Sequence, residues 1–177
     1  MTFSHLQVSS AFSLKYGTAQ PHALVQRAAE LGQSIVGLTD RDGLYGAVRW
    51  ALACQEVGVH PVIGVDMAVE ATTPTDPVAG RRRTPAHGGR WLDQSRPRVL
   101  LLAAGAQGWA SLCRLVSAAH LGEHTERGTP WLTWAAMREH QEGLVALLPA
   151  ESELGELIAT QRAHRAASAI RPWRAIF

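Results

Sequence analysis

Short apolar runs alternate with stretches in which apolar residues recur every three or four positions over the first 70 residues of the chain. Three runs predict strands, namely Phe3–Val8, Ile35–Leu38 and Val62–Val69. Between them, residues 21–31 and 44–57 place their apolar side chains on one helical face, and Gly32 and Gly58 supply the helix stops. Successive strand–helix units of this kind predict an α/β fold, with a parallel sheet or barrel covered by helices.

The pattern breaks between residues 71 and 97, which are rich in Pro, Gly, Thr and Arg and have no sustained periodicity. This predicts a long surface loop. It carries Arg81, Arg82 and Arg83, which we expect either to stay solvated or to contact a DNA phosphate backbone. Beyond the loop the pattern predicts further strands and helices: strands at Val99–Ala103 and Leu144–Leu148, and helices at Gln107–His120, Trp131–Glu139 (capped by Thr129 or Thr133) and Glu151–Ile170. We expect residues 1–177 to form one domain segment.

Composition narrows the class of protein. Hydrophobic residues make up 46% of the chain and charged residues 18%, which is typical of a folded domain, and a net charge of +2 does not by itself indicate a nucleic-acid-binding protein. No apolar run is long enough to cross a bilayer. The two cysteines, Cys54 and Cys113, lie far apart in apolar helical patterns, which favours free thiols and a cytoplasmic location.

Six segments, in order along the chain, resemble the PHP domain that begins bacterial DNA polymerase III α subunits and their error-prone relatives. They are His5–Gly17 (HLQVSSAFSLKYG), Leu38–Val48 (LTDRDGLYGAV), Val59–Asp66 (VHPVIGVD), Arg98–Ala103 (RVLLLA), Gly108–Ser117 (GWASLCRLVS) and Glu142–Leu147 (EGLVAL). The resemblance implies a distorted seven-stranded (β/α) barrel with a cluster of up to three metal ions. In some members this domain is a metal-dependent 3′–5′ proofreading exonuclease. In others the ligands have decayed and the domain is a structural platform.

The metal-ligand positions of that family are only partly retained. In this sequence they fall on His5, Gln7, Tyr16, Arg41, Asp66, Arg98 and Ala150. His5 keeps an imidazole and Asp66 a carboxylate, but Arg41 and Arg98 place permanent cations where the family has histidines. A metal cluster needs neutral imidazoles and carboxylates. We therefore expect no bound metal and no catalytic residue in this segment, and Mg²⁺ only in the parent polymerase.

The two arginines need partners of opposite charge. We expect Arg41 and Arg98 to form ion pairs with Asp40, Asp42 or Asp66, which would fill the former site; a weak anion pocket is the alternative. A second possible metal pair, His120 and His124, has i, i+4 spacing, but the stretch from residue 121 to 128 favours solvated loop histidines.

Three functions follow from this resemblance. The first is the structural N-terminal PHP domain of a replicative or error-prone polymerase, with the rest of that chain, DNA and an exonuclease or other replication subunit as partners. The alternatives are a metal-dependent PHP phosphoesterase or exonuclease, and a free-standing protein-interaction remnant. The family's barrel has further strands beyond Phe177, so we expect an incomplete barrel of about five strands, whose exposed apolar edge favours self-association.

Overall fold

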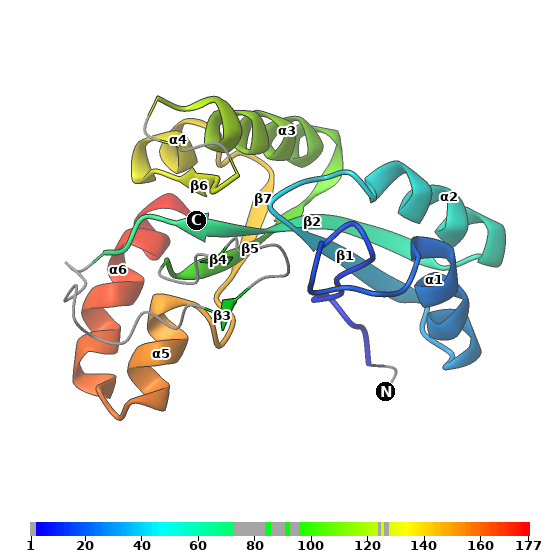
Figure 1. Ribbon diagram of the computed structural model, residues 1–177, viewed down its shortest axis with the longest axis horizontal. Coiled ribbons are helices and arrows are strands. Elements are labelled where there is room, and N and C mark those ends of the chain that lie inside the picture. Colours follow the sequence, from blue (N-terminus) through cyan, green and yellow to red (C-terminus); the bar gives the residue numbers. More distant parts are fainter. Residues whose placement is uncertain (1–2, 73–83, 86–90, 93–95, 124, 126–127) are drawn as a thin grey trace.

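A mixed sheet runs through the protein, and helices pack around it (Figure 1). The computed structural model describes residues 3–72, 84–85, 91–92, 96–123, 125 and 128–177. The strands are β1 Ile35–Arg41, β2 His60–Val69, β3 Thr84–Pro85, β4 Trp91–Leu92, β5 Arg98–Ala103, β6 Trp131–Leu132 and β7 Leu144–Leu147. The helices are α1 Pro21–Glu30, α2 Ala47–Val57, α3 Gly105–Leu121, α4 Trp134–Glu139, α5 Glu153–Ala159 and α6 Ala166–Ile176, with a 3₁₀ turn, η1, at Ala163–Arg165.

The main sheet has five strands in the described part of the chain, in the order β1-β2-β5-β7, with β6 beside the end of β2. This confirms the expected incomplete barrel of about five strands. The pairs β1–β2 and β2–β6 are parallel, whereas β2–β5 and β5–β7 are antiparallel. The parallel arrangement expected from the first strand–helix units is confirmed for β1 and β2, and β5 is the strand that reverses direction. A parallel crossover usually needs a helix, and none is described between β2 and β5.

The N-terminal segment Phe3–Val8 follows the edge of β1 but is not a strand. Its carbonyls at His5 and Val8 accept hydrogen bonds from the amides of Gly37 and Thr39, at 2.7 and 2.9 Å. Three residues on this segment thus face two on β1, and the amide of Val8 bonds to the Thr39 hydroxyl at 3.2 Å instead of a carbonyl. The ladder is irregular for this reason, and the strand predicted at Phe3–Val8 is not formed.

Two predicted helices have different bounds in the structure. Trp131 belongs to β6, and Thr133 caps α4 by accepting a hydrogen bond from the amide of Ala136 at 3.1 Å, as one of the two predicted caps. The single helix expected over residues 151–170 is divided into α5, η1 and α6. Gln161 has φ of 58°, a left-handed conformation that ends the helical path.

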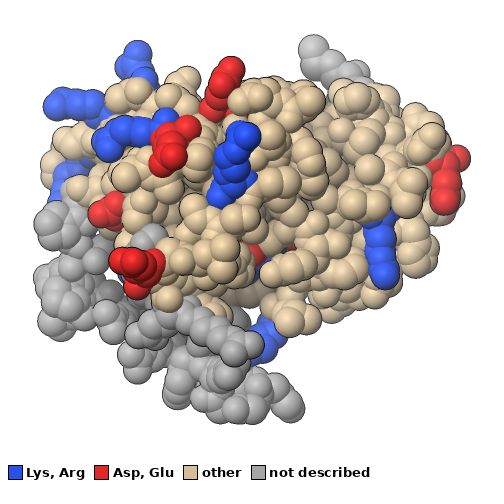
Figure 2. Space-filling model, turned by 90° about the horizontal axis from the view of Figure 1, so that it is seen from above, with Lys and Arg blue, Asp and Glu red and all other residues tan. Residues whose placement is uncertain are grey.

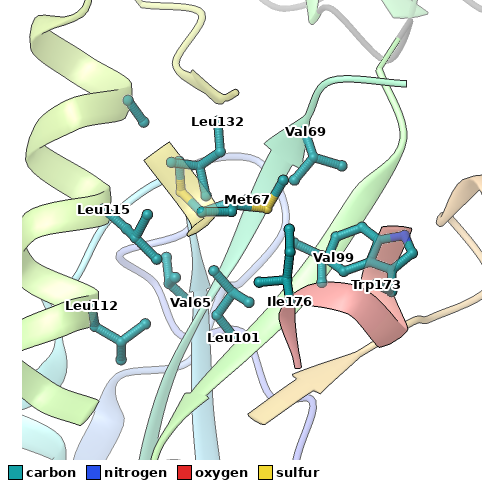
Figure 3. Close-up of a cluster of buried hydrophobic side chains, with 12 residues drawn as sticks. Val65, Met67, Val69, Val99, Leu101, Leu112, Leu115, Leu132, Trp173 and Ile176 are labelled. Carbon is teal, nitrogen blue, oxygen red and sulfur yellow. The ribbon is translucent and has the colours of Figure 1, made fainter. Parts of the chain in front are cut away.

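The larger hydrophobic core lies on one face of β2 and β5, between α3 and α6 (Figure 3). Its fully or almost fully buried members include Val65, Met67, Val69, Val99, Leu101, Leu112, Leu115, Leu132, Trp173 and Ile176. A second core joins α1 and α2 to β1 around Val36, Trp50 and Cys54. Because alternate strand residues face opposite sides, the core residues of β2 and β5 leave Asp66 and Arg98 on the other face.

Two further expectations concern the loop and the membrane. Within residues 71–97, the structure describes the short antiparallel pair β3–β4, in which Thr84 pairs with Leu92. Arg81, Arg82 and Arg83 lie outside the described residues. Among the described helices, none is both long enough and apolar enough to cross a bilayer.

Candidate functional site

Strand register brings three of the expected site residues together at one end of the sheet. Arg41 is the last residue of β1 and is the Cα partner of Asp66 in β2. Arg98 is the first residue of β5 and pairs with Ala68, two residues beyond Asp66 on the same face. Because β5 runs antiparallel to β2, the beginning of β5 meets the carboxyl ends of β1 and β2. With Asp42, these residues form what we call the ionic cluster: Arg41, Asp42, Asp66 and Arg98.

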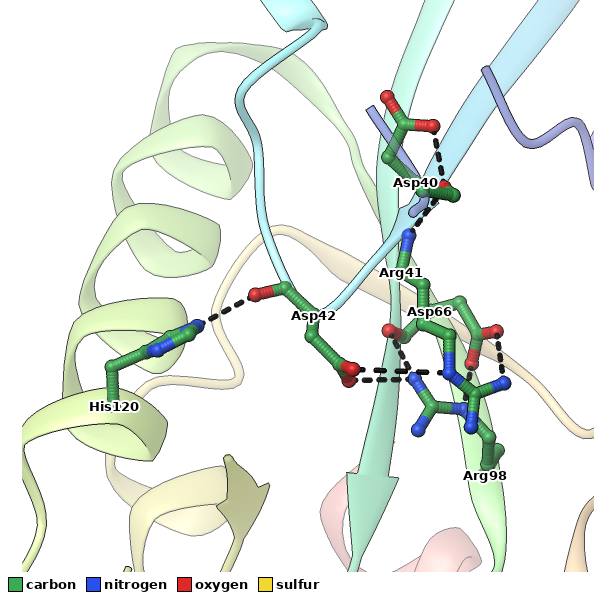
Figure 4. Close-up of polar contacts among 7 residues, drawn as sticks. Asp40, Arg41, Asp42, Asp66, Arg98 and His120 are labelled. Carbon is green, nitrogen blue, oxygen red and sulfur yellow. Dashed lines mark hydrogen bonds and ion pairs between the residues drawn. The ribbon is translucent and has the colours of Figure 1, made fainter. Parts of the chain in front are cut away.

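Arg98 is the centre of the ionic cluster (Figure 4). Its Nε donates to Oδ1 of Asp66 at 2.7 Å, and one terminal nitrogen donates both to Oδ1 of Asp42 and to the backbone oxygen of Asp66, each at 2.7 Å. The residue is only 6% exposed. These are short, charge-assisted hydrogen bonds of a buried guanidinium, and they tie the start of β5 to β2 and to the turn after β1.

Arg41 is held more loosely than Arg98. Its guanidinium nitrogens lie 3.8 Å from Asp42 Oδ2 and 3.9 Å from Asp66 Oδ2, which are ion-pair distances beyond hydrogen-bond range. The guanidinium carbon sits 4.1 Å from the centroid of the Tyr16 ring, which gives a cation–π contact. Tyr16, another former ligand position, thus supports a cation. The expected ion pairs of both arginines with Asp42 and Asp66 are confirmed.

Asp42 connects the ionic cluster to helix α3. Its φ of 60° places it in the left-handed region, and its amide donates to the Asp66 carbonyl at 2.9 Å. Its own carbonyl accepts a hydrogen bond from Nε2 of His120 at 2.6 Å. His120 lies in α3, as the predicted helix Gln107–His120 has it; its side chain is exposed but is not only solvated, since it holds the turn after β1. His124 lies outside the described residues.

Burial and charge shift the pKa values of the ionic cluster. Burial lowers the pKa of Arg41, and the positive charge of Arg98 lowers it further. Burial acts on Arg98 in the same direction, but the Asp66 and Asp42 carboxylates outweigh it and raise the pKa of Arg98. Burial raises the pKa of the Asp66 carboxyl, with both arginines opposing it. An arginine remains protonated at neutral pH, so two cations face two carboxylates in this cluster.

Asp40 is not part of the ionic cluster. The expectation that it pairs with Arg41 or Arg98 is therefore wrong. Its carboxylate, 1% exposed, accepts hydrogen bonds from the amide of Ser10 at 2.7 Å, the hydroxyl of Ser10 at 2.8 Å and the hydroxyl of Ser13 at 2.7 Å. The Ser13 hydroxyl in turn accepts from the amide of Arg41 at 2.9 Å. Asp40 therefore anchors the N-terminal loop to β1.

His5 and Gln7, the first two positions that match the ligand pattern of the resembled family, line an open cavity of about 430 Å³ with Leu100, Leu147 and Leu148 among its other walls. Both side chains are exposed. The His5 ring makes an edge contact with Phe3, with ring centroids 4.7 Å apart. None of the charged residues of the ionic cluster lines this cavity, although Leu100 in its wall is the Cα partner of Asp66.

Ala150, the last former ligand position, is exposed and carries a methyl group that offers no ligand atom. The neighbouring backbone nevertheless reaches the ionic cluster, because the carbonyl of Glu151 accepts a hydrogen bond from the amide of Arg98 at 3.0 Å. This contact places the end of the β7–α5 connection beside the start of β5.

The donor set around Asp66 does not fit a cluster of divalent ions. The two carboxylates, from Asp42 and Asp66, already face two guanidiniums. Over the described ranges of the chain, no three His, Cys, Asp or Glu side chains come close enough together to hold a metal ion. A metal placed here would meet two fixed positive charges in a buried setting, at a cost on the order of 4 kcal/mol for each contact.

The family model and the curated relatives that match this chain agree with each other. The model of the PHP domain matches residues 5–177. The error-prone DNA polymerase of Mycobacterium tuberculosis (strain ATCC 25618 / H37Rv) is 36% identical over 143 residues, which are 81% of this chain and 12% of the relative. The DNA polymerase III subunit alpha of Caulobacter vibrioides is 34% identical over 145 residues, again 82% of this chain and 12% of the relative. The chain thus spans about an eighth of the length of these curated relatives.

Among solved structures, an amidohydrolase from Chromobacterium violaceum matches with a TM-score of 0.46 and 20% sequence identity. The match covers 67% of this chain and 34% of that chain. This likeness is too low to add to the assignment.

Proposed function

The chain belongs to the PHP domain family, and from that premise we propose that it is the non-catalytic N-terminal PHP segment of a bacterial DNA polymerase of the DNA polymerase III α or error-prone type. Its part in replication or repair synthesis is structural: it presents a folded platform to the rest of the polymerase chain and to an exonuclease or other replication subunit. The Mg²⁺ used in synthesis belongs to the polymerase part of the chain.

The observation that carries this proposal is the position of Arg98. A guanidinium stands at a position where the resembled family has a histidine ligand, and it bonds to both Asp66 and Asp42 at 2.7 Å. A metal ion at that place links strand ends through shared ligands, and Arg98 links the same ends through hydrogen bonds. The ionic cluster keeps the fold of the site while removing its Lewis-acid chemistry.

The second support is the lack of a group of ligand side chains. A two- or three-metal phosphodiesterase needs several imidazoles and carboxylates gathered around its metal ions. Among the residues that the structure describes, no three His, Cys, Asp or Glu side chains are grouped closely enough to hold a metal ion, and Asp66 faces two arginines. The phosphoesterase and exonuclease hypotheses therefore have less support than the structural one.

A nuclease assay tests the proposal directly. The chain is incubated with 3′-labelled single-stranded and mismatched duplex DNA in Mg²⁺, Mn²⁺ or Zn²⁺, beside a His5→Ala variant prepared in the same way. We expect no release of label above that of His5→Ala. Release that His5→Ala and Asp66→Asn both abolish would overturn the non-catalytic assignment.

A second test concerns the parent protein. The genomic reading frame after codon 177 either encodes a DNA polymerase or it does not. Polymerase sequence in frame supports the proposed context. A stop codon close to Phe177 would contradict it and favour the free-standing interaction module.

A further inference from the structure

Basic residues gather at the C-terminal end of the described chain without acidic neighbours in sequence. From Gln161 to Phe177 there are four arginines and one histidine, and no Asp or Glu. These residues are Arg162, His164, Arg165, Arg171 and Arg174, and all five are exposed. Four of the five side chains belong to η1 and α6, and Arg162 directly precedes η1; we call the five together the basic face.

Helix α6 separates its apolar and basic sides. Ala169, Trp173 and Ile176 are buried, and the last two belong to the larger core. Trp173 is stacked on Phe177 and in edge contact with Trp134. At 100° per residue, Arg171 lies about opposite Ala169, and Arg174 lies about 60° from Arg171. Packing of the apolar side thus fixes the direction in which these arginines point, which is away from the core.

The arginines of the basic face are not neutralised within the protein. Over the part of the chain that the structure describes, no carboxylate lies within 4.0 Å of Arg162, Arg165, Arg171 or Arg174, whereas Arg27, Arg41 and Arg98 all have such a partner. The acidic residues of the adjoining α5, Glu153 and Glu156, lie in its first turn. Seen from above, from the side on which α3 and α4 lie, basic and acidic side chains are mixed toward the left end of the molecule (Figure 2).

The placement of the cations also suits a polyanion. Arg171 and Arg174 lie one turn apart on the outer side of α6, roughly 5 Å along the helix axis, and Arg165 stands at the N-terminal end of the helix. Between Arg165 and Arg171 the exposed residues are Ala167 and Ser168, which are small and let a backbone approach closely. Guanidinium groups match phosphate oxygens in their planar, forked geometry.

We propose that the basic face of η1 and α6 binds the phosphate backbone of DNA. The cationic surface is a feature of the structure itself. The choice of DNA over another polyanion rests on the proposed function as part of a polymerase. Contact of this kind fixes position without reading sequence, which suits a structural domain that meets many DNA sequences in turn. It is separate from Arg81, Arg82 and Arg83, which lie outside the described residues.

Fluorescence anisotropy with labelled 20-base DNA, single-stranded and duplex, tests this inference over 50 to 200 mM salt. The informative variant is Arg171→Gln/Arg174→Gln. Arg49→Gln/Arg114→Gln is a matched control, because it removes the same charge from two exposed arginines on α2 and α3. A third variant, Arg171→Lys/Arg174→Lys, keeps the charge.

We expect the wild-type chain, the control pair and the lysine pair to bind both DNAs with similar salt dependence. For Arg171→Gln/Arg174→Gln on duplex DNA, the slope of log K against log salt should be shallower by about 2 than for the wild type. When the salt concentration is raised fourfold, the fold-loss of affinity should therefore be about tenfold smaller for this variant than for the wild type. Equal loss of binding in the control pair, or no change in Arg171→Gln/Arg174→Gln, would overturn the inference. So would binding of anionic phospholipid vesicles by a chain that does not bind DNA. A nuclease result bears on the proposed function and leaves this comparison of variants unaffected.

Discussion

Arg98 and Asp66 are 32 residues apart in sequence, yet Nε of Arg98 donates to Oδ1 of Asp66 at 2.7 Å. The contact exists because β5 runs antiparallel to β2, which brings the first residue of one strand beside the carboxyl end of the other. A cation and an anion at these two positions tie the two strand ends together.

Removing Arg98 tests the strength of this link. In Arg98→Met, Asp66 and Asp42 lose the guanidinium that bonds to both. Loss of one partner from a buried ion pair leaves an uncompensated charge, so we expect the free energy of unfolding to fall by about 3–5 kcal/mol in urea denaturation. Arg27→Met is the control, because Arg27 and Glu30 form an exposed pair, and its expected cost is about 0–1 kcal/mol.

A double-mutant cycle separates the pair from its surroundings. We expect Arg98→Met combined with Asp66→Asn to cost at least about 1 kcal/mol less than the sum of the two single changes, because the residues are in direct contact. If the losses in the free energy of unfolding of the two single variants add up to that of the double variant, the 2.7 Å hydrogen bond contributes nothing to stability, and Arg98 does not link the strand ends.

The carboxylate of Asp40 provides a second stability test. It accepts three hydrogen bonds from Ser10 and Ser13 and is 1% exposed. Asp40→Ala leaves buried donors without an acceptor, and we expect a loss of roughly 3 kcal/mol in urea denaturation. Ser13→Ala should cost less, since Ser10 still binds the carboxylate. A cost for Asp40→Ala no larger than that for the exposed Glu30→Ala would contradict this role.

Much of the fold could be predicted from periodicity, but strand direction could not. The apolar runs around β1, β2, β5 and β7 were visible, as were the faces of α1, α2 and α3, because each element buries one side against the two cores. The antiparallel direction of β5 depends on the connection through residues 71–97, whose sequence has no periodic pattern. No local signal indicates whether such a segment returns the chain as a crossover or as a hairpin.

The contacts of the candidate site, too, could be predicted from the sequence only in part. The ion pairs of Arg41 and Arg98 were predictable, because buried arginines require carboxylates and Asp42 and Asp66 lay at neighbouring strand ends. The bond between His120 and the Asp42 carbonyl was not, because a backbone acceptor 78 residues away leaves no mark in the sequence around a histidine. Asp40 was assigned to the wrong partners, since hydroxyl donors in a loop carry little sequence signal.

The two cysteines should differ sharply in reactivity. Burial raises the pKa of the Cys54 thiol to about 11, whereas Cys113 is half-buried. We expect a thiol reagent at pH 8 to label Cys113 in the folded protein and Cys54 only after unfolding. Because the folded-state pKa of Cys54 exceeds its unfolded value, its contribution to stability is present at neutral pH and is lost as the pH rises through about 11. Equal labelling rates at pH 8 would contradict its burial.

Among the strands that the structure describes, β7 has a partner on one side only, and this edge predicts self-association. Strand β7 is the outer strand of the main path and pairs with β5 on one side, and Val145 in it is 49% exposed. An apolar edge strand invites pairing with a second chain. Analytical ultracentrifugation should show a weight-average mass that rises with concentration, and Val145→Lys should reduce this rise. A wild-type chain that stays monomeric across the concentration range would contradict the prediction.

The most direct test of the central claim is the metal content of the chain. The protein is dialysed with excess Zn²⁺ and Mn²⁺, separated from free metal, and measured by inductively coupled plasma mass spectrometry. The account predicts a stoichiometry near zero, and the same value for His5→Ala, because Arg41 and Arg98 already compensate the carboxylates of Asp42 and Asp66. About one metal ion or more per chain, lost in His5→Ala, would contradict it and restore the phosphoesterase hypothesis.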